Sequence, residues 1–218
     1  MKWTARLAKF VWLAVFGGLS ALSALLPACG PMEGQVSRPK ADGWYGADRL
    51  PGVTLEAINA ACGDPRGAAE AGVSYDECRL IIAGAAVRES SWDVNKSCEA
   101  WGDWNDPACG LTQSRWMDAR AVGLDCSPSE QSSNGYKCNA LTGFRNLRCK
   151  ADGGTSCDRW GGGRTLHTGI KKHLGPNQGV FESYKYDMET VYNRQDIRQR
   201  LYISGGVRSW YDLLHAPQ

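Results

Sequence analysis

The sequence carries little excess charge of either sign. Its 218 residues include 25 Lys and Arg against 23 Asp and Glu, which gives a formal net charge of +2. Proteins that bind nucleic acids usually show a strongly basic domain or a clustered basic patch. Three of the basic residues also fall within the first nine positions, which we expect to be cleaved off, so the remaining chain is close to neutral. We therefore expect no nucleic-acid partner.

The sequence also lacks the ligand spacing of a zinc site. No two cysteines have close C-x-x-C spacing and the three histidines are scattered, so we expect no metal and no other cofactor. Nine cysteines are present. Apart from Cys29 they form an even set, which in an exported chain predicts four disulfides in an oxidising compartment. Their spacing leaves the pairing open: Cys62, Cys78, Cys98, Cys109, Cys126, Cys138, Cys149 and Cys157.

The start of the chain predicts export. A basic beginning is followed by an apolar run over residues 10–26, which is typical of a signal peptide. Residues 26–29 read Leu-Pro-Ala-Cys and resemble a bacterial lipobox. This resemblance implies cleavage after residue 28 and a lipid on Cys29, which would attach the protein to a membrane. An ordinary secretory signal and a short retained membrane anchor are the alternatives. The residue after Cys29 is Gly30 rather than Asp, which resembles the sorting signal of outer-membrane lipoproteins. This resemblance implies an outer-membrane lipoprotein that faces the periplasm in a Gram-negative host.

The remaining chain predicts one mainly α domain behind a tether. Residues 29–52 contain many Pro and Gly and no periodic pattern, so we expect a tether whose end docks through Trp44 and Tyr45. Residues 53–218 suit a single domain. Residues 124–164 lack periodicity, and their four cysteines predict an ordered, stapled loop with room for a small hairpin. Helices are expected over residues 53–62, 74–89, 114–122, 165–174, 187–201 and 207–214.

The clearest helix pattern covers residues 74–89. Ser74 and Glu77 have the spacing of a capping box, and apolar residues then recur at steps of three and four. Glu89 ends the run in the last turn, where the helix dipole disfavours a negative charge. A partly buried carboxyl at this position would hold its proton, as a general acid must. A solvated Glu with no role is the alternative.

Glu89 begins a short motif, and a second motif follows it along the chain. Residues 89–92 read Glu-Ser-Ser-Trp, and residues 110–113 read Gly-Leu-Thr-Gln, followed by Ala119 and Gly123. This series resembles the catalytic domain of soluble lytic transglycosylases and goose-type lysozymes, in the lysozyme-like superfamily. Weaker matches follow at residues 165–174 and 202–207, so the resemblance covers about residues 53–214. It implies a helix-dominated α+β, lysozyme-like fold with disulfide-stapled loops.

The resemblance also implies an activity. The family cleaves the β-1,4 bond between N-acetylmuramic acid and N-acetylglucosamine in peptidoglycan. Glu89 would protonate the glycosidic oxygen and then take a proton from the sugar's own 6-hydroxyl, which closes a 1,6-anhydro ring. The expected substrate-binding residues are Ser90, Trp92, Gly110, Gln113 and Tyr202, of which Tyr202 would also hydrogen-bond near Glu89. A plain core tyrosine is the alternative for Tyr202. We expect a monomer that acts on glycan strands.

Two other functions stay open. A hydrolytic goose-type lysozyme would need a second carboxylate to activate water, and Asp93, Asp103 and Asp106 lie in the adjacent loop. The same residues beside Gly, Asn and Pro are typical of turns. A catalytically silent wall-binding lipoprotein would instead use the Trp-rich loop, although its tryptophans could equally cover the end of the core helix. Thr112 in place of the family's Met and Ile203 in place of its Asn leave the substrate preference open.

Overall fold

The computed structural model describes residues 42–99, 105–129, 133–148, 165–174 and 178–217. These residues belong to one compact unit. The predicted signal peptide, Cys29 and most of the predicted tether lie outside them. In this part of the chain helices dominate, and the only β pairing consists of two isolated bridges, Glu99 with Ala108 and Cys109 with Ser114. The prediction of a mainly α protein is confirmed.

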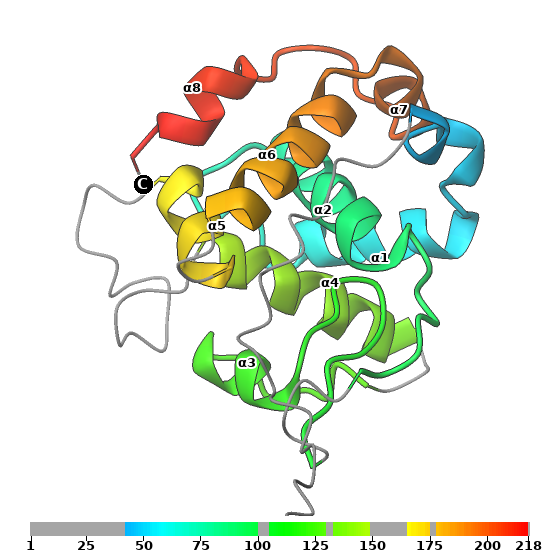
Figure 1. The fold of residues 1–218 in the computed structure, drawn as a ribbon, viewed down its shortest axis with the longest axis vertical. Coiled ribbons are helices and arrows are strands. Elements are labelled where there is room, and N and C mark those ends of the chain that lie inside the picture. The colour runs from blue at the N-terminus through cyan, green and yellow to red at the C-terminus, as the bar shows by residue number, and fades with distance from the viewer. Residues whose placement is uncertain (1–41, 100–104, 130–132, 149–164, 175–177, 218) are drawn as a thin grey trace, which may run out of the picture. The chain divides into compact units, whose positions relative to one another are not determined.

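The described elements follow one another with short connections in several places (Figure 1). In chain order they are η1 (Asp42–Trp44), η2 (Ala47–Arg49), α1 (Gly52–Gly63), α2 (Tyr75–Ser90), α3 (Trp116–Ala121), α4 (Ser133–Arg148), α5 (Leu166–Leu174), α6 (Gln178–Asn193), α7 (Gln195–Arg200) and α8 (Trp210–His215). None of these helices is long and apolar enough to cross a membrane.

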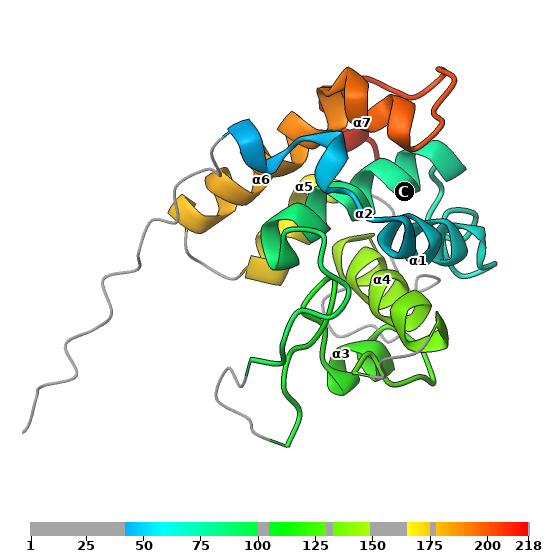
Figure 2. The ribbon, with the colours of Figure 1, turned by 90° about the vertical axis from the view of Figure 1, so that its right-hand side faces the viewer.

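Helix α2 is the centre of the packing. It lies against α6, α1 and α4, as Figures 1 and 2 show. Twelve of its sixteen residues are buried. The predicted capping box is confirmed, because the Glu77 amide donates to the Ser74 hydroxyl at 3.1 Å and the Ser74 amide donates to Glu77 at 2.8 Å. Gly84 allows the close approach to α6, since a Cβ there would lie 3.0 Å from the Met188 Cα.

The prediction of a loop throughout residues 124–164 is wrong, because α4 occupies its middle. Hydrophobic periodicity does not predict this helix, because many of its buried side chains are polar. Asn139 donates to the carbonyls of Cys109 and Pro128 at 2.7 and 3.0 Å, and Arg145 donates to the Val122 carbonyl at 2.8 Å. No hairpin occurs in the described parts of this segment. The polar side chains of α4 bind the surrounding loops through hydrogen bonds to their backbone carbonyls.

Two other helix boundaries differ from the prediction. The helix expected over residues 187–201 is two helices, α6 and α7, separated at Arg194. Helix α6 also begins earlier, at Gln178, because Phe181 and Tyr184 are already part of the core. Thr54 does not cap α1. It is buried and donates to the Trp92 carbonyl at 2.7 Å, so it ties the start of α1 to the segment after α2.

The end of the predicted tether packs into the domain. Tyr45 and Leu50 are almost completely buried. The Tyr45 hydroxyl donates to Asp187 on α6, and the Arg200 guanidinium donates to the Leu50 carbonyl at 3.2 Å. The predicted docking is therefore confirmed for Tyr45. Trp44 stays 39 % exposed, with the Arg49 guanidinium 5.1 Å from its ring centroid.

Three disulfides join six of the eight cysteines that were predicted to pair. Cys62–Cys78 links α1 to α2, Cys98–Cys109 closes the segment after α2, and Cys126–Cys138 ties the preceding loop to α4. Cys149 and Cys157 lie outside the described residues. The predicted disulfide framework is thus confirmed for the cysteines that the structure describes.

Candidate functional site

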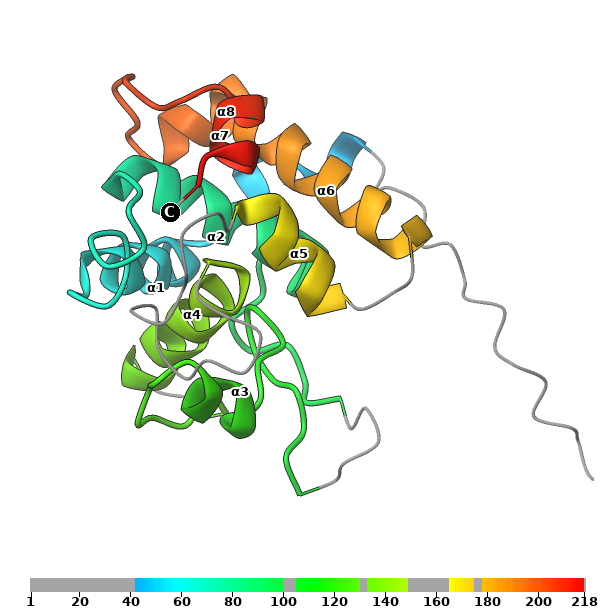
Figure 3. The same ribbon diagram turned by 90° about the vertical axis from the view of Figure 1, so that its left-hand side faces the viewer.

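Glu89 lies where three helices meet. It occupies the last turn of α2, and its side chain is 20 % exposed. His173, in the last turn of α5, places its Nε2 atom 3.5 Å from Glu89 Oε1 and is 22 % exposed. Tyr184 of α6 hydrogen-bonds the same carboxylate. Helices α5 and α6 lie side by side in Figures 1 and 3, which explains how residues distant in sequence reach Glu89.

Tyr184 is suited to be a permanent hydrogen-bond donor. Its side chain is only 2 % exposed. Burial raises the pKa of its hydroxyl well above the ordinary value, and the nearby charge of Glu89 and their hydrogen bond raise it further. The hydroxyl therefore stays protonated at physiological pH and can act toward Glu89 only as a hydrogen-bond donor. The Glu89 side chain beside it stays 20 % exposed.

A buried ion pair fixes the helices beneath this cluster. Arg88 donates to Asp187 Oδ2 at 2.9 Å, and the Tyr45 hydroxyl donates to Asp187 Oδ1. Asp187 is fully buried, so these bonds compensate the loss of its hydration. Because Asp187 follows Tyr184 by three residues, both side chains lie on the face of α6 that meets α2. The ion pair thus sets the register that brings Tyr184 to Glu89.

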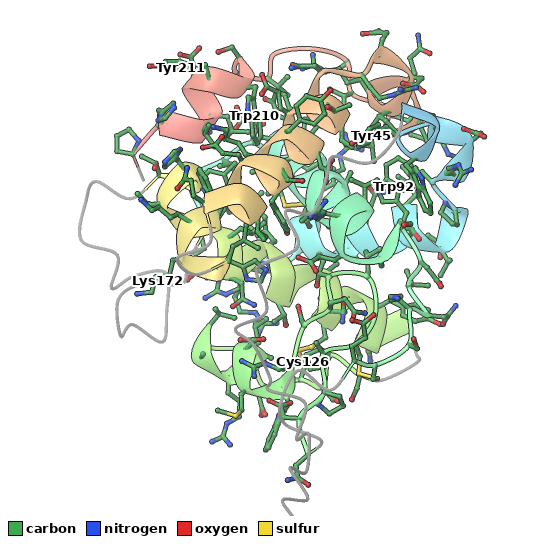
Figure 4. The ribbon with its side chains drawn as sticks, viewed as in Figure 1. Tyr45, Trp92, Cys126, Lys172, Trp210 and Tyr211 are labelled. Carbon is green, nitrogen blue, oxygen red and sulfur yellow. A yellow bond between two sulfur atoms is a disulfide. The ribbon has the colours of Figure 1, made fainter. Side chains whose placement is uncertain are left out.

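The residues that directly follow Glu89 point into the protein. Trp92, which is labelled in Figure 4, is completely buried and donates from Nε1 to the Ala83 carbonyl of α2 at 2.7 Å. The prediction that Trp92 contacts a sugar is therefore wrong, since the ring covers the end of the core helix. Ser90 is also buried, and its hydroxyl donates to the Ala86 carbonyl at 3.0 Å. Ser90 therefore offers no exposed hydroxyl in this conformation.

The Gly-Leu-Thr-Gln segment forms a tight turn. Gly110 has a φ of +70°, and a Cβ there would lie 2.8 Å from Asn139 Nδ2, so only glycine fits. Gln113 also has a positive φ, of 43°, and its Nε2 donates to the Gly110 carbonyl at 2.9 Å. The Gln113 Oε1 atom is buried without a hydrogen-bond partner. The role of Gly110 and Gln113 toward a sugar stays a prediction.

Tyr202 does not lie beside Glu89. Its side chain is 77 % exposed just after α7. The preceding carbonyl, of Leu201, accepts a hydrogen bond from Arg79 in the first half of α2. Glu89 lies further along the same helix by about 15 Å, at 1.5 Å per residue. The prediction that Tyr202 supports Glu89 is therefore wrong, and Tyr184 makes that hydrogen bond.

The carboxylates proposed to activate water have structural roles where they are described. Asp93 is exposed, and its Oδ1 accepts from the Asn95 amide at 2.8 Å in a local turn. Both oxygens of Asp106 accept from backbone amides at the start of α3, from Trp116 at 2.7 Å and Met117 at 3.0 Å. The turn interpretation is confirmed for Asp93, whereas Asp106 caps the start of α3 rather than forming a turn of its own. Asp103 lies outside the described residues, as do Trp101 and Trp104.

The comparisons with known proteins give no information about the site, so it is identified from its geometry alone. No protein-family model, curated protein or solved structure matches this chain.

Within the described part of the chain, no group of three or more His, Cys, Asp and Glu residues could hold a metal ion. A hollow of about 340 Å³ lies at the Cys126–Cys138 disulfide, between Arg66 and Lys137, but none of the predicted site residues lines it. The Glu89 cluster is therefore the candidate site.

Sequence reasoning missed His173 and Tyr184. His173 falls within the helix expected over residues 165–174, and Tyr184 lies in a stretch where periodicity predicts no helix. Neither has a local signal, because each is brought to Glu89 only by the tertiary arrangement of α5 and α6. Together with Glu89 they form a group that can give up and take back a proton: a partly exposed carboxyl, an imidazole and a phenol.

Proposed function

We propose that this chain is a peptidoglycan lytic transglycosylase with a lysozyme-like fold. The proposal is carried by one observation, the partly exposed Glu89 carboxyl at the end of a buried helix, with the buried, protonated Tyr184 hydroxyl near it. The helix-dominated architecture and the compact turn at Gly110 support it further. A buried helix that ends in an accessible acid is what a single-acid glycosidase needs.

The proposed reaction begins with proton transfer from Glu89 to the glycosidic oxygen. The bond between that oxygen and C1 of N-acetylmuramic acid breaks, and the 6-hydroxyl of the same sugar then forms a bond to C1. A base must take the 6-hydroxyl proton, and in the single-carboxylate form of the reaction this base is the ionised Glu89. The Tyr184 hydroxyl would stabilise the carboxylate during the time it is ionised.

The hydrolytic alternative has less support. An inverting hydrolase places a second carboxylate across the sugar to activate water. The carboxylates of Asp93 and Asp106 are engaged by backbone amides in a turn and at the start of α3. Neither is therefore free to play that part without breaking the local structure. Among the candidate carboxylates that the structure describes, this observation favours the transglycosylase over the lysozyme; Asp103 lies outside the described residues.

We propose that the protein is a membrane-anchored lipoprotein, because residues 1–30 resemble a lipoprotein signal. The three disulfides agree with it, because disulfides persist mainly in oxidising compartments such as the periplasm. Peptidoglycan strands would be reached from there.

The activity is tested by incubating the full chain with purified peptidoglycan and measuring product masses. Anhydro-muramyl ends, lighter by one water than reducing ends, are the expected products. Glu89→Gln is expected to reduce product formation at least 100-fold, since general acid catalysis contributes a factor of about 100 to 10,000. Glu56→Gln, an exposed substitution on α1, is the matched control and should retain activity. Cleavage by the Glu89→Gln variant at the wild-type rate would remove Glu89 from the mechanism.

A further inference from the structure

The imidazole of His173 stands beside Glu89 and has no assigned role in the proposed reaction. Its Nε2 atom lies 3.5 Å from Glu89 Oε1, and each side chain is about one-fifth exposed, at 22 % and 20 %. Both residues are in the final turns of helices, α5 and α2. The Tyr184 ring packs edge-on against the imidazole, with centroids 6.1 Å apart. A substrate oxygen could therefore approach both Glu89 and His173 from the solvent side.

We propose that His173 is a second catalytic residue, the base that takes the 6-hydroxyl proton while Glu89 serves as the acid. This inference rests on the proposed function and assigns its second proton transfer. Histidine side chains exchange protons near neutral pH, which suits them to act as bases under physiological conditions. Glu89 would then not have to be acid and base in turn.

The short distance between His173 Nε2 and Glu89 Oε1 fits a reaction in which Glu89 is the acid and His173 is the base. In 1,6-anhydro ring closure the leaving oxygen and the attacking 6-hydroxyl lie on the same face of the sugar, so the acid and the base must be neighbours. In an inverting hydrolase the two groups act on opposite faces and are about 6.5–9.5 Å apart. A nitrogen and an oxygen separated by 3.5 Å match the first geometry. The pair is therefore placed for attack on the face from which the leaving group departs, as ring closure by the sugar's own hydroxyl requires.

The proton balance closes without any other reactant. Glu89 gives its proton to the leaving oxygen as the C1–oxygen bond breaks. His173 takes the proton of the 6-hydroxyl as the new C1–oxygen bond forms. Proton exchange with water then returns His173 to its neutral form and Glu89 to its acid form, and both groups are ready for the next strand.

The surrounding charges come from three helices. On α2, Arg88 is paired with Asp187 of α6, so its charge is balanced by that buried carboxylate. Tyr184 of α6 is neutral because burial raises its pKa. On α5 itself, Lys171 and Lys172 precede His173 and are exposed; Figure 4 labels Lys172 on this helix. Glu89 is therefore the carboxylate that directly faces the imidazole among the described neighbours.

The test compares His173→Gln with wild type in the full chain, using the peptidoglycan digest over a range of pH. We expect kcat to fall about 100-fold with KM within twofold, and the pH profile of kcat to lose its acidic limb, because the group that must be unprotonated is gone. His167→Gln, on the same helix but outside the cluster, is the matched control and should keep the wild-type profile.

A second variant separates chemistry from folding. His173→Ala is expected to regain at least tenfold activity when free imidazole is added, since the base can be supplied from solution, whereas a purely structural defect would not respond. A His173→Gln variant with wild-type kcat and an unchanged pH profile would overturn the inference alone. An inactive wild type, in a digest that a known muramidase completes, would overturn the proposed function and this inference with it.

Discussion

At the scale of single residues, the hydrogen bond from Tyr184 to Glu89 is the contact that most directly controls the acid. Tyr184→Phe removes the hydroxyl but keeps the buried ring, so packing is largely conserved. We expect kcat to fall about tenfold with little change in KM, because a hydrogen bond to a charged group contributes about 1.5–3 kcal/mol. Steady-state digestion kinetics measure this, and thermal unfolding checks that the fold is kept.

The control for that variant lies on the same helix. Tyr186→Phe removes the hydroxyl of a tyrosine that is 49 % exposed, and it should leave kcat unchanged. If Tyr184→Phe also keeps the wild-type kcat, the phenol has no part in holding Glu89. A fall in both variants would instead point to a general effect on α6.

At the scale of secondary-structure elements, the start of α2 carries an acid-sensitive link. Burial of Glu77 would raise its pKa, but hydrogen bonds from the Arg208 side chain and the Ser74 amide outweigh it and lower the pKa from 4.5 to about 2. Arg208 lies just before α8, so Glu77 ties that segment to α2. The ionised Glu77 therefore stabilises the arrangement of these elements.

This link predicts a pH dependence of stability. Because the pKa of Glu77 is lower in the folded chain, its contribution is fully present above pH 4.5 and is lost as the pH falls toward 2. Asp196, whose pKa is lowered to about 2 by its hydrogen bond with Arg194, adds to the same trend. Urea unfolding between pH 2 and 6 should show the loss. Glu77→Gln should flatten the curve, and an equally steep curve in that variant would refute the assignment.

The elements also differ in how far the sequence could predict them. Helix α2 was predictable because its cap and its apolar residues are local signals, and Ser74 and Glu77 behave as their spacing indicated. Helix α4 was not, since Asn139 and Arg145 are buried by long-range bonds to loop carbonyls, which periodicity cannot detect. Glu89 could be singled out by its position, whereas Tyr184 could not, because only the packing of α6 on α2 brings it there.

At the scale of the whole molecule, the disulfides connect parts that would otherwise separate on unfolding. Cys62–Cys78 joins α1 to the central helix across 16 residues. Closing a loop of this size stabilises a fold by about 3 kcal/mol in the chain-entropy account. The Cys62→Ser, Cys78→Ser double variant should lose about that much unfolding free energy, as measured by urea titration. A loss below 0.5 kcal/mol would show that the link contributes little to stability.

The central claim is that Glu89 is the acid of a transglycosylase. The most direct measurement is the mass spectrum of peptidoglycan fragments released by the full wild-type chain and by Glu89→Gln at equal concentration. The account predicts anhydro-muramyl ends from the wild type and no products above background from the variant. Reducing ends from the wild type would contradict the transglycosylase assignment, and anhydro ends from both proteins would contradict the role of Glu89.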